Sequence, residues 1–154
     1  MLAAVDAVND AQKQVLFGKI SKRFPELKGK IIALWGLAFK ANTDDMREAP
    51  SRMLIDDLVR AGASVRAYDP AAANEARELF QDKKSIEITS SALDALDGAD
   101  ALAIVTEWQE FRSPDFAALK SRLKTPAIFD GRNLYDPAVL RELGFEYYPI
   151  GRKA

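Results

Sequence analysis

From Ile31 onward, short apolar runs alternate with helical stretches, and this alternation restricts the possible folds more than any other feature of the sequence. The run Ile31–Trp35 is apolar throughout, which is typical of a strand covered on both faces. The pattern predicts strands at Ile31–Trp35, Ser64–Tyr68, Ile86–Ile88, Ala101–Val105, Pro126–Phe129 and Phe145–Tyr148, and helices at Pro50–Arg60, Asp69–Phe80, Ser91–Leu96, Pro114–Leu123 and Pro137–Leu143. Alternating strands and helices with short connections predict an α/β fold: a doubly wound parallel sheet with helices on both faces.

The stretch before this domain predicts one long amphipathic helix from Leu2 to Phe24, which Pro25 ends. At about 1.5 Å per residue it is on the order of 35 Å long, so we expect part of its apolar stripe to pack on something else. No capping residue precedes it, which favours a chain cut from inside a longer polypeptide over a frayed terminal helix. We therefore expect residues 1–27 to be the end of a linker helix and residues 28–154 to be the α/β domain.

Charge and residue content exclude several classes of function. The 154 residues include 22 Lys and Arg against 23 Asp and Glu, which argues against electrostatically driven binding of nucleic acid or membrane. The chain has no Cys and no His, which removes Cys/His zinc sites, thiol nucleophiles and Ser-His-Asp triads, and we expect no metal. The longest near-apolar run, Ile31 to Phe39, is far shorter than the roughly 20 residues of a membrane span. Because Asp6 and Asp10 stand where a signal peptide carries basic residues, we expect a soluble, cytoplasmic protein.

Unusual polar residues follow the predicted strands, at the edge where open α/β sheets bind ligands. The loop after the first strand has a single glycine, Gly36, and runs some fourteen residues before Pro50. It therefore does not match the short G-x-G-x-x-G turn that binds dinucleotides. Asp69, which ends the second strand, is better interpreted as a turn and helix-capping residue than as a ribose-binding acid.

Three cations at this edge are suited to phosphate. Lys40 has a mobile ammonium group, and Arg47 has a planar guanidinium that can contact a phosphate through two hydrogen bonds. From composition alone, a solvated surface charge or an ion pair with local acids is the more frequent role for each. Arg132 has a stronger case, because Gly131 permits close backbone approach and Arg132 leaves a strand at the same edge as Lys40. Two cations that converge on one crevice predict a diphosphate ligand.

The residues after the predicted strand Ala101–Val105 are Thr106, Glu107 and Trp108. Trp108 could stack on a base, but sealing the core is the more frequent role of such a residue. Thr106 and Glu107 are expected to hold the long loop through hydrogen bonds. No pair of carboxylates suggests acid/base catalysis.

Five segments occur in one order along the chain: GLAFKANTDDMREAPS, VRAYDP, GADALAIVTEW, IFDGRNLYDP and GFEYYPIGR. Together they resemble the C-terminal UDP-binding domain of the nucleotide-sugar dehydrogenases, and the UDP-glucose 6-dehydrogenases fit best. VDAVNDAQKQ resembles the end of their central helix, so the resemblance covers Val5 to Arg152. It implies a Rossmann-like domain and the oxidation of UDP-glucose by two NAD⁺ to UDP-glucuronate, with NAD bound mainly by an N-terminal domain.

Carried over residue by residue, the resemblance implies that Phe39, Lys40 and Arg132 contact the UDP-sugar and that Arg47 reaches NAD. The glycine fingerprint and the catalytic cysteine have no counterpart, so no catalytic residue is expected here and the chain alone is expected to be inactive. In the full-length enzyme the family implies a homodimer through the central helix. The alternatives are a related UDP-N-acetylmannosamine or GDP-mannose dehydrogenase domain, a non-catalytic UDP-sugar-binding module, and an assembly unit.

Overall fold

The computed structural model describes residues 15–38, 40–46 and 49–150 of the chain. In that part, six parallel strands form one sheet, and they are β1 (Ile31–Trp35), β2 (Ser64–Tyr68), β3 (Ile86–Ile88), β4 (Ala101–Ile104), β5 (Ala127–Asp130) and β6 (Glu146–Pro149). Their spatial order is β3-β2-β1-β4-β5-β6, and every neighbouring pair is parallel. This is the doubly wound order of Rossmann-like folds, so the predicted fold class is confirmed.

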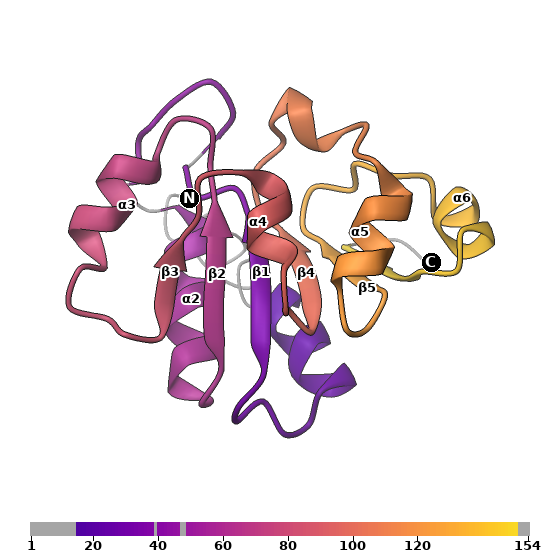
Figure 1. Cartoon of the computed structure of the whole chain (residues 1–154), viewed down its shortest axis with the longest axis horizontal. Helices are drawn as coiled ribbons and strands as arrows, with labels where there is room; N and C mark the ends of the chain where they lie inside the picture. Colours follow the sequence, from indigo (N-terminus) through magenta and orange to yellow (C-terminus); the bar gives the residue numbers. More distant parts are fainter. Residues whose placement is uncertain (1–14, 39, 47–48, 151–154) are drawn as a thin grey trace, which may run out of the picture.

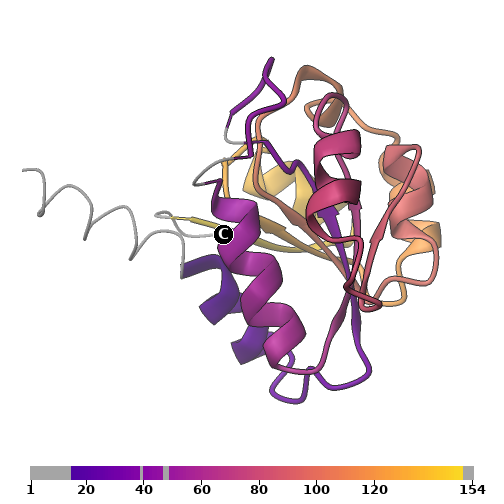
Figure 2. The same cartoon turned by 90° about the vertical axis from the view of Figure 1, so that its left-hand side faces the viewer.

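Helices cover both faces of the sheet (Figures 1 and 2). They are α2 (Pro50–Arg60), α3 (Ala73–Leu79), α4 (Ala92–Leu96), α5 (Phe116–Arg122) and α6 (Pro137–Glu142), with a 3-10 helix η1 at Gln109–Phe111. One buried cluster joins the sheet to α2, α3 and the N-terminal helix through Leu58, Ala76 and Ile20. A second joins its other face to α4 and α6 through Leu96 and Leu140. Because both faces are buried, β1 and β4 are apolar throughout rather than alternating, as is β5 up to its last residue, Asp130.

The predicted elements lie where expected, with differences at their ends. The largest is α3, which begins at Ala73 rather than at Asp69. The Asp69 carboxylate accepts hydrogen bonds from the backbone N–H groups of Ala71 and Ala72, at 2.8 Å each, and holds these residues in a turn. The helix α5 also begins later than predicted, after its capping residue Asp115.

The N-terminal helix is described only at its end. Residues 15–23 are helical, and Leu16, Ile20 and Phe24 are buried against the sheet. Arg23 also forms an ion pair with Glu146 of β6, with 2.6 Å between Nε and Oε1. Residues 1–14 of the predicted helix lie outside the described residues, and the division at residue 27 stays a prediction. None of the described helices combines the length and the apolar character that a membrane crossing requires.

Candidate functional site

Four strands end in register at one edge of the sheet. Trp35 of β1 pairs with Tyr68 of β2 and with Ile104 of β4, and Ile104 pairs with Asp130 of β5. From there β1 leads to α2 on one face, whereas β4 leads to α5 on the other. Ligands of open α/β sheets bind at such a point, where the winding reverses. The strand-end edge is defined as residues 36–38, 40, 105–107 and 130–132.

Gly36 brings the backbones that leave β1 and β4 into close contact. Its φ is +99°, and a Cβ at this position would lie 2.5 Å from the Cβ of Thr106. Its N–H donates to the carbonyl of Tyr68 at 2.8 Å, and the N–H of Val105 donates to the carbonyl of Trp35 at 3.0 Å. The glycine is therefore required both by its backbone conformation and by the absence of space.

Asp69, 1% exposed at the end of β2, organises the backbone that leaves β1. Its Oδ2 accepts hydrogen bonds from the N–H groups of Leu37 and Ala38, at 2.7 and 3.0 Å, and from Nε1 of Trp108 at 3.1 Å. Its Oδ1 accepts from the N–H groups of Ala71 and Ala72 in the turn before α3, so the predicted turn role is confirmed. The predicted capping role is not, because the N-cap residue of α3 is Ala72 and no side chain caps that helix. The bonds from Oδ2 were not predicted, because they join segments far apart in the sequence.

The carbonyl groups after β1 are held as well. The Thr106 hydroxyl donates to the carbonyl of Ala38 at 2.9 Å, and the Ser51 hydroxyl of α2 donates to the carbonyl of Leu37 at 2.6 Å. The prediction that Thr106 holds the long loop is therefore confirmed. Trp108 packs against the core on the side of α4 and α5, which confirms its packing role.

The turn after β5 is held mainly by Asp130, which is completely buried. Its Oδ1 accepts from the N–H of Arg132 at 2.9 Å, and its Oδ2 accepts from the N–H of Leu134 at 2.7 Å and the hydroxyl of Tyr147 at 2.6 Å. The N–H of Gly131 donates to the carbonyl of Ile104 at 2.8 Å, so the turn is also fixed to β4. The sequence analysis did not select Asp130, although a carboxylate that ends a buried strand before Gly is a signal for such a turn.

The side chain of Arg132 lies against the residues that leave β4. Its Nε donates to the carbonyl of Val105 at 3.0 Å and lies 3.2 Å from Oε2 of Glu107. Both side chains of this ion pair are about one third exposed, at 34% and 33%. Glu107 was expected to hold the long loop; in the described residues it pairs with Arg132 instead, because β5 lies beside β4.

Lys40 is exposed, and within the described residues its ammonium forms no hydrogen bond or ion pair. Ala38, two residues earlier, is bound to Thr106, whereas Arg132 is bound to the adjacent Val105. The segments that carry Lys40 and Arg132 are therefore attached to the two residues that directly follow β4. Phe39 and Arg47, the other two predicted site residues, lie outside the described residues.

Tyr68 adds a neutral group near this edge. Its hydroxyl donates to both carboxylate oxygens of Glu110, at 3.0 and 3.2 Å. Burial, followed by the hydrogen bond to Glu110, raises the pKa of Tyr68 to about 12. The phenol is therefore protonated at neutral pH and adds no negative charge.

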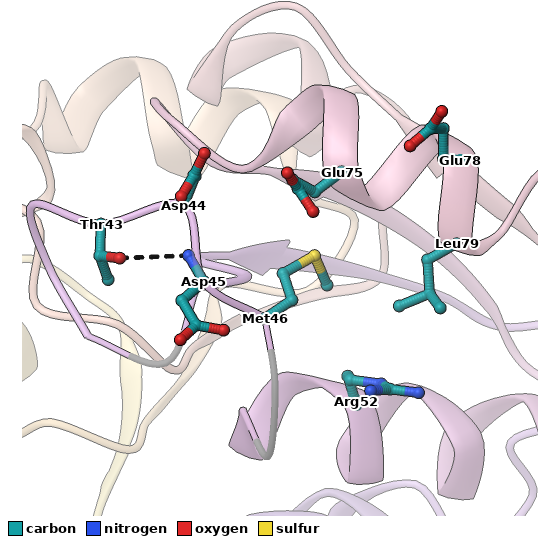
Figure 3. A pocket seen from close by; sticks show the side chains of 8 residues that line it. All are labelled: Thr43, Asp44, Asp45, Met46, Arg52, Glu75, Glu78 and Leu79. Atoms are coloured by element: carbon teal, nitrogen blue, oxygen red, sulfur yellow. Dashed lines mark hydrogen bonds between the residues drawn. The ribbon is translucent and has the colours of Figure 1, made fainter.

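A separate hollow of about 730 Å³ lies beside the long loop (Figure 3). We call it the acidic hollow, and its lining residues are Thr43, Asp44, Asp45, Met46, Arg52, Glu75, Glu78 and Leu79. Four carboxylates face one guanidinium there, so a polyanionic ligand would be repelled. The described residues contain no group of three or more acidic side chains arranged to hold a metal ion.

The comparison with known proteins agrees with this geometry. Residues 33–137 match the model of the UDP-glucose/GDP-mannose dehydrogenase family, UDP binding domain. The chain belongs to this family. A UDP-glucose 6-dehydrogenase of Pseudomonas aeruginosa is 46% identical over 99% of the chain, but the match covers only 34% of that relative. The chain thus spans about a third of the length of the curated relatives it matches.

Solved structures of this family share the fold. A UDP-glucose dehydrogenase from Pyrobaculum islandicum superimposes with a TM-score of 0.77 at 28% identity, over 95% of this chain and 31% of that one. A UDP-D-ManNAc dehydrogenase from Pyrococcus horikoshii gives a TM-score of 0.71 at 27% identity, over 92% of this chain and 30% of that one. The family resemblance predicted from the sequence is therefore confirmed.

Proposed function

We propose that the chain is the C-terminal UDP-sugar-binding domain of a UDP-glucose 6-dehydrogenase, and that the strand-end edge binds the diphosphate of UDP-glucose. The observation that carries this proposal is the attachment of both cation-bearing segments to Val105 and Thr106. Arg132 supplies an oriented planar donor, and Lys40 a mobile ammonium. Two such cations match the two adjacent phosphorus groups of a nucleoside diphosphate.

The proposal assigns the remaining contacts from the family resemblance. Phe39 contacts the UDP-sugar together with Lys40 and Arg132, and Arg47 reaches NAD bound by another part of the enzyme. In the complete enzyme, the reaction would oxidise UDP-glucose to UDP-glucuronate with two NAD⁺. The work of this chain would be to bind and orient the nucleotide, because it has no cysteine that could form a thioester.

The exit of β1 does not fit the pyrophosphate of NAD. In a dinucleotide-binding turn, free backbone N–H groups after the first strand cradle the phosphates. Here the N–H of Gly36 donates to the carbonyl of Tyr68, and those of Leu37 and Ala38 donate to Asp69. These donors are already used, which supports a main NAD site outside this chain.

Calorimetric titration of the 154-residue chain with UDP tests the proposal. We expect weak binding, because a cleft needs most of the ligand surface buried to bind tightly and the chain is one third of its relatives' length. Titrations with GDP and with UDP-sugars test the base preference. Failure of the chain to bind any nucleoside diphosphate would contradict the proposal, and formation of NADH from UDP-glucose and NAD⁺ would contradict the assignment as a non-catalytic part.

A second candidate is the corresponding domain of a UDP-N-acetylmannosamine dehydrogenase. This candidate is supported by the Pyrococcus horikoshii structure, a UDP-D-ManNAc dehydrogenase that is 27% identical to the chain. The UDP-glucose dehydrogenase structure has nearly the same identity to the chain, 28%. Both candidates share the diphosphate site and differ in the sugar. Competition between UDP-glucose and UDP-N-acetylmannosamine for the same site separates them.

A further inference from the structure

We propose that Glu107 is a built-in competitor of the nucleotide phosphate: its carboxylate pairs with Arg132 and lowers the affinity of the strand-end edge for nucleoside diphosphates. The inference rests on the proposed function, because it concerns the ligand of that same edge. It adds a residue that sets how tightly the ligand is held.

The geometry of the pair carries this inference. Oε2 of Glu107 is buried and lies 3.2 Å from Nε of Arg132, yet no hydrogen-bond donor in the described part of the chain satisfies it. A buried carboxylate oxygen without a hydrogen bond is costly. Arg132 is the cation that pairs with this carboxylate in the described residues, and a phosphate that approaches Arg132 must share this cation with Glu107.

Arg132 also has contacts that do not involve Glu107. Nε of Arg132 already donates to the carbonyl of Val105 at 3.0 Å, and the N–H of Arg132 donates to Asp130 at 2.9 Å. A glutamine at position 107 keeps the length and shape of the side chain and removes only the negative charge. This substitution therefore tests the charge of Glu107 while the bonds of Arg132 to Val105 and Asp130 stay available.

The test is the affinity of the Glu107→Gln chain for UDP, measured by calorimetry at low and at high KCl. We expect UDP to bind about threefold to tenfold more tightly than to the unaltered chain at low salt. The gain is expected to shrink at high salt, because the pair is one third exposed and screened. Glu107→Ala removes the same charge and is expected to tighten binding as well. Weaker binding of UDP by Glu107→Gln would overturn the inference, because it would mean that Glu107 itself contacts the ligand. Unchanged binding would also overturn it, because Glu107 would then have no influence on the affinity.

Glu110→Gln is the matched control, because it makes the same change in net charge three residues later. Glu110 pairs with the Tyr68 hydroxyl and forms no ion pair with Arg132 among the described residues. We expect its affinity for UDP to stay within about twofold of the unaltered chain. If Glu110→Gln raised the affinity for UDP as much as Glu107→Gln, the effect would be due to net charge alone, and the inference would be overturned. If the unaltered chain binds no UDP, or Arg132→Ala binds it equally well, the proposed function itself fails.

Discussion

The strand-end edge and the acidic hollow both use the loop after β1, but they differ in charge and in how they are held. The edge is fixed by the buried side chains of Asp69, Thr106 and Asp130, which lie at or just after the ends of β2, β4 and β5. It presents Lys40 and Arg132. The hollow has an open volume of about 730 Å³, and Asp44 and Glu75 are among its four carboxylates. A concave volume is the usual first candidate for a ligand site. Here the charge and the order of the backbone support the proposal that the ligand binds at the edge instead.

The largest effect is expected for Asp69→Ala, because one buried carboxylate holds the exits of both β1 and β2. The variant leaves the N–H groups of Leu37 and Ala38 and the indole of Trp108 without their acceptor. We expect the free energy of unfolding to fall by about 3–5 kcal/mol in urea denaturation. Asp44→Ala, an exposed carboxylate of the acidic hollow, is the control and should change it by less than about 0.5 kcal/mol. Similar losses in the two variants would remove the distinction between the regions.

The next effect concerns Gly36, where backbone conformation and crowding act together. Gly36→Ala would place a Cβ 2.5 Å from that of Thr106 at a φ of +99°, so we expect a loss of about 2–4 kcal/mol in stability. Gly98→Ala is the matched control, because Gly98 also has a positive φ, +76°, but nothing lies within 4 Å of the added Cβ. It should lose only about 1–2 kcal/mol. Equal losses would show that the close approach of β1 and β4 contributes nothing.

Nucleotide affinity compares the two regions directly. Lys40→Ala and Arg132→Ala should each weaken UDP binding by about 1.5–3 kcal/mol, since in the proposed complex each would remove a charged hydrogen bond to phosphate. Glu75→Gln in the acidic hollow should leave the affinity nearly unchanged, as should Lys124→Ala, which precedes β5 at the opposite end of the sheet. Calorimetric titration measures all four. Unchanged binding in both edge variants would refute their assignment.

The smallest effect lies outside both regions, at the ion pair between Arg23 and Glu146. The hydrogen bond from Arg23 lowers the pKa of Glu146 from its ordinary value of 4.5. Because the folded pKa is the lower one, the pair stabilises the fold above pH 4.5 and this contribution is lost as the pH falls through the folded pKa. The pair is partly exposed, so we expect less than about 1 kcal/mol. Glu146→Gln should remove this part of the acid dependence in urea denaturation, whereas the exposed Glu142→Gln should retain it.

The sequence predicted the elements well because most of them depend on local patterns. Buried apolar runs such as Ile31–Trp35 are visible without knowledge of their neighbours, and Asp69 before Pro70 indicates a turn from its own segment. The start of α3 was predicted too early, since the same carboxylate also holds the turn before it. Boundaries depend on such competition between a turn and a helix.

The site was only partly predictable, because its contacts join distant segments. Lys40 and Arg132 were selected as cations at strand ends, and the structure attaches their segments to Thr106 and Val105, which directly follow β4. The pairing of Glu107 with Arg132 was missed because it depends on the position of β5 beside β4. The bond from Tyr147 to Asp130 was missed for the same reason, since β6 supplies it.

The central claim is that UDP binds at the strand-end edge rather than in the acidic hollow. The most direct measurement is a titration of the ¹⁵N-labelled chain with UDP, followed by the shifts of its backbone amide resonances. Our account predicts the largest shifts at Lys40, Thr106 and Arg132. Shifts concentrated at Asp44 and Glu78 instead, with those three amides unmoved, would contradict it.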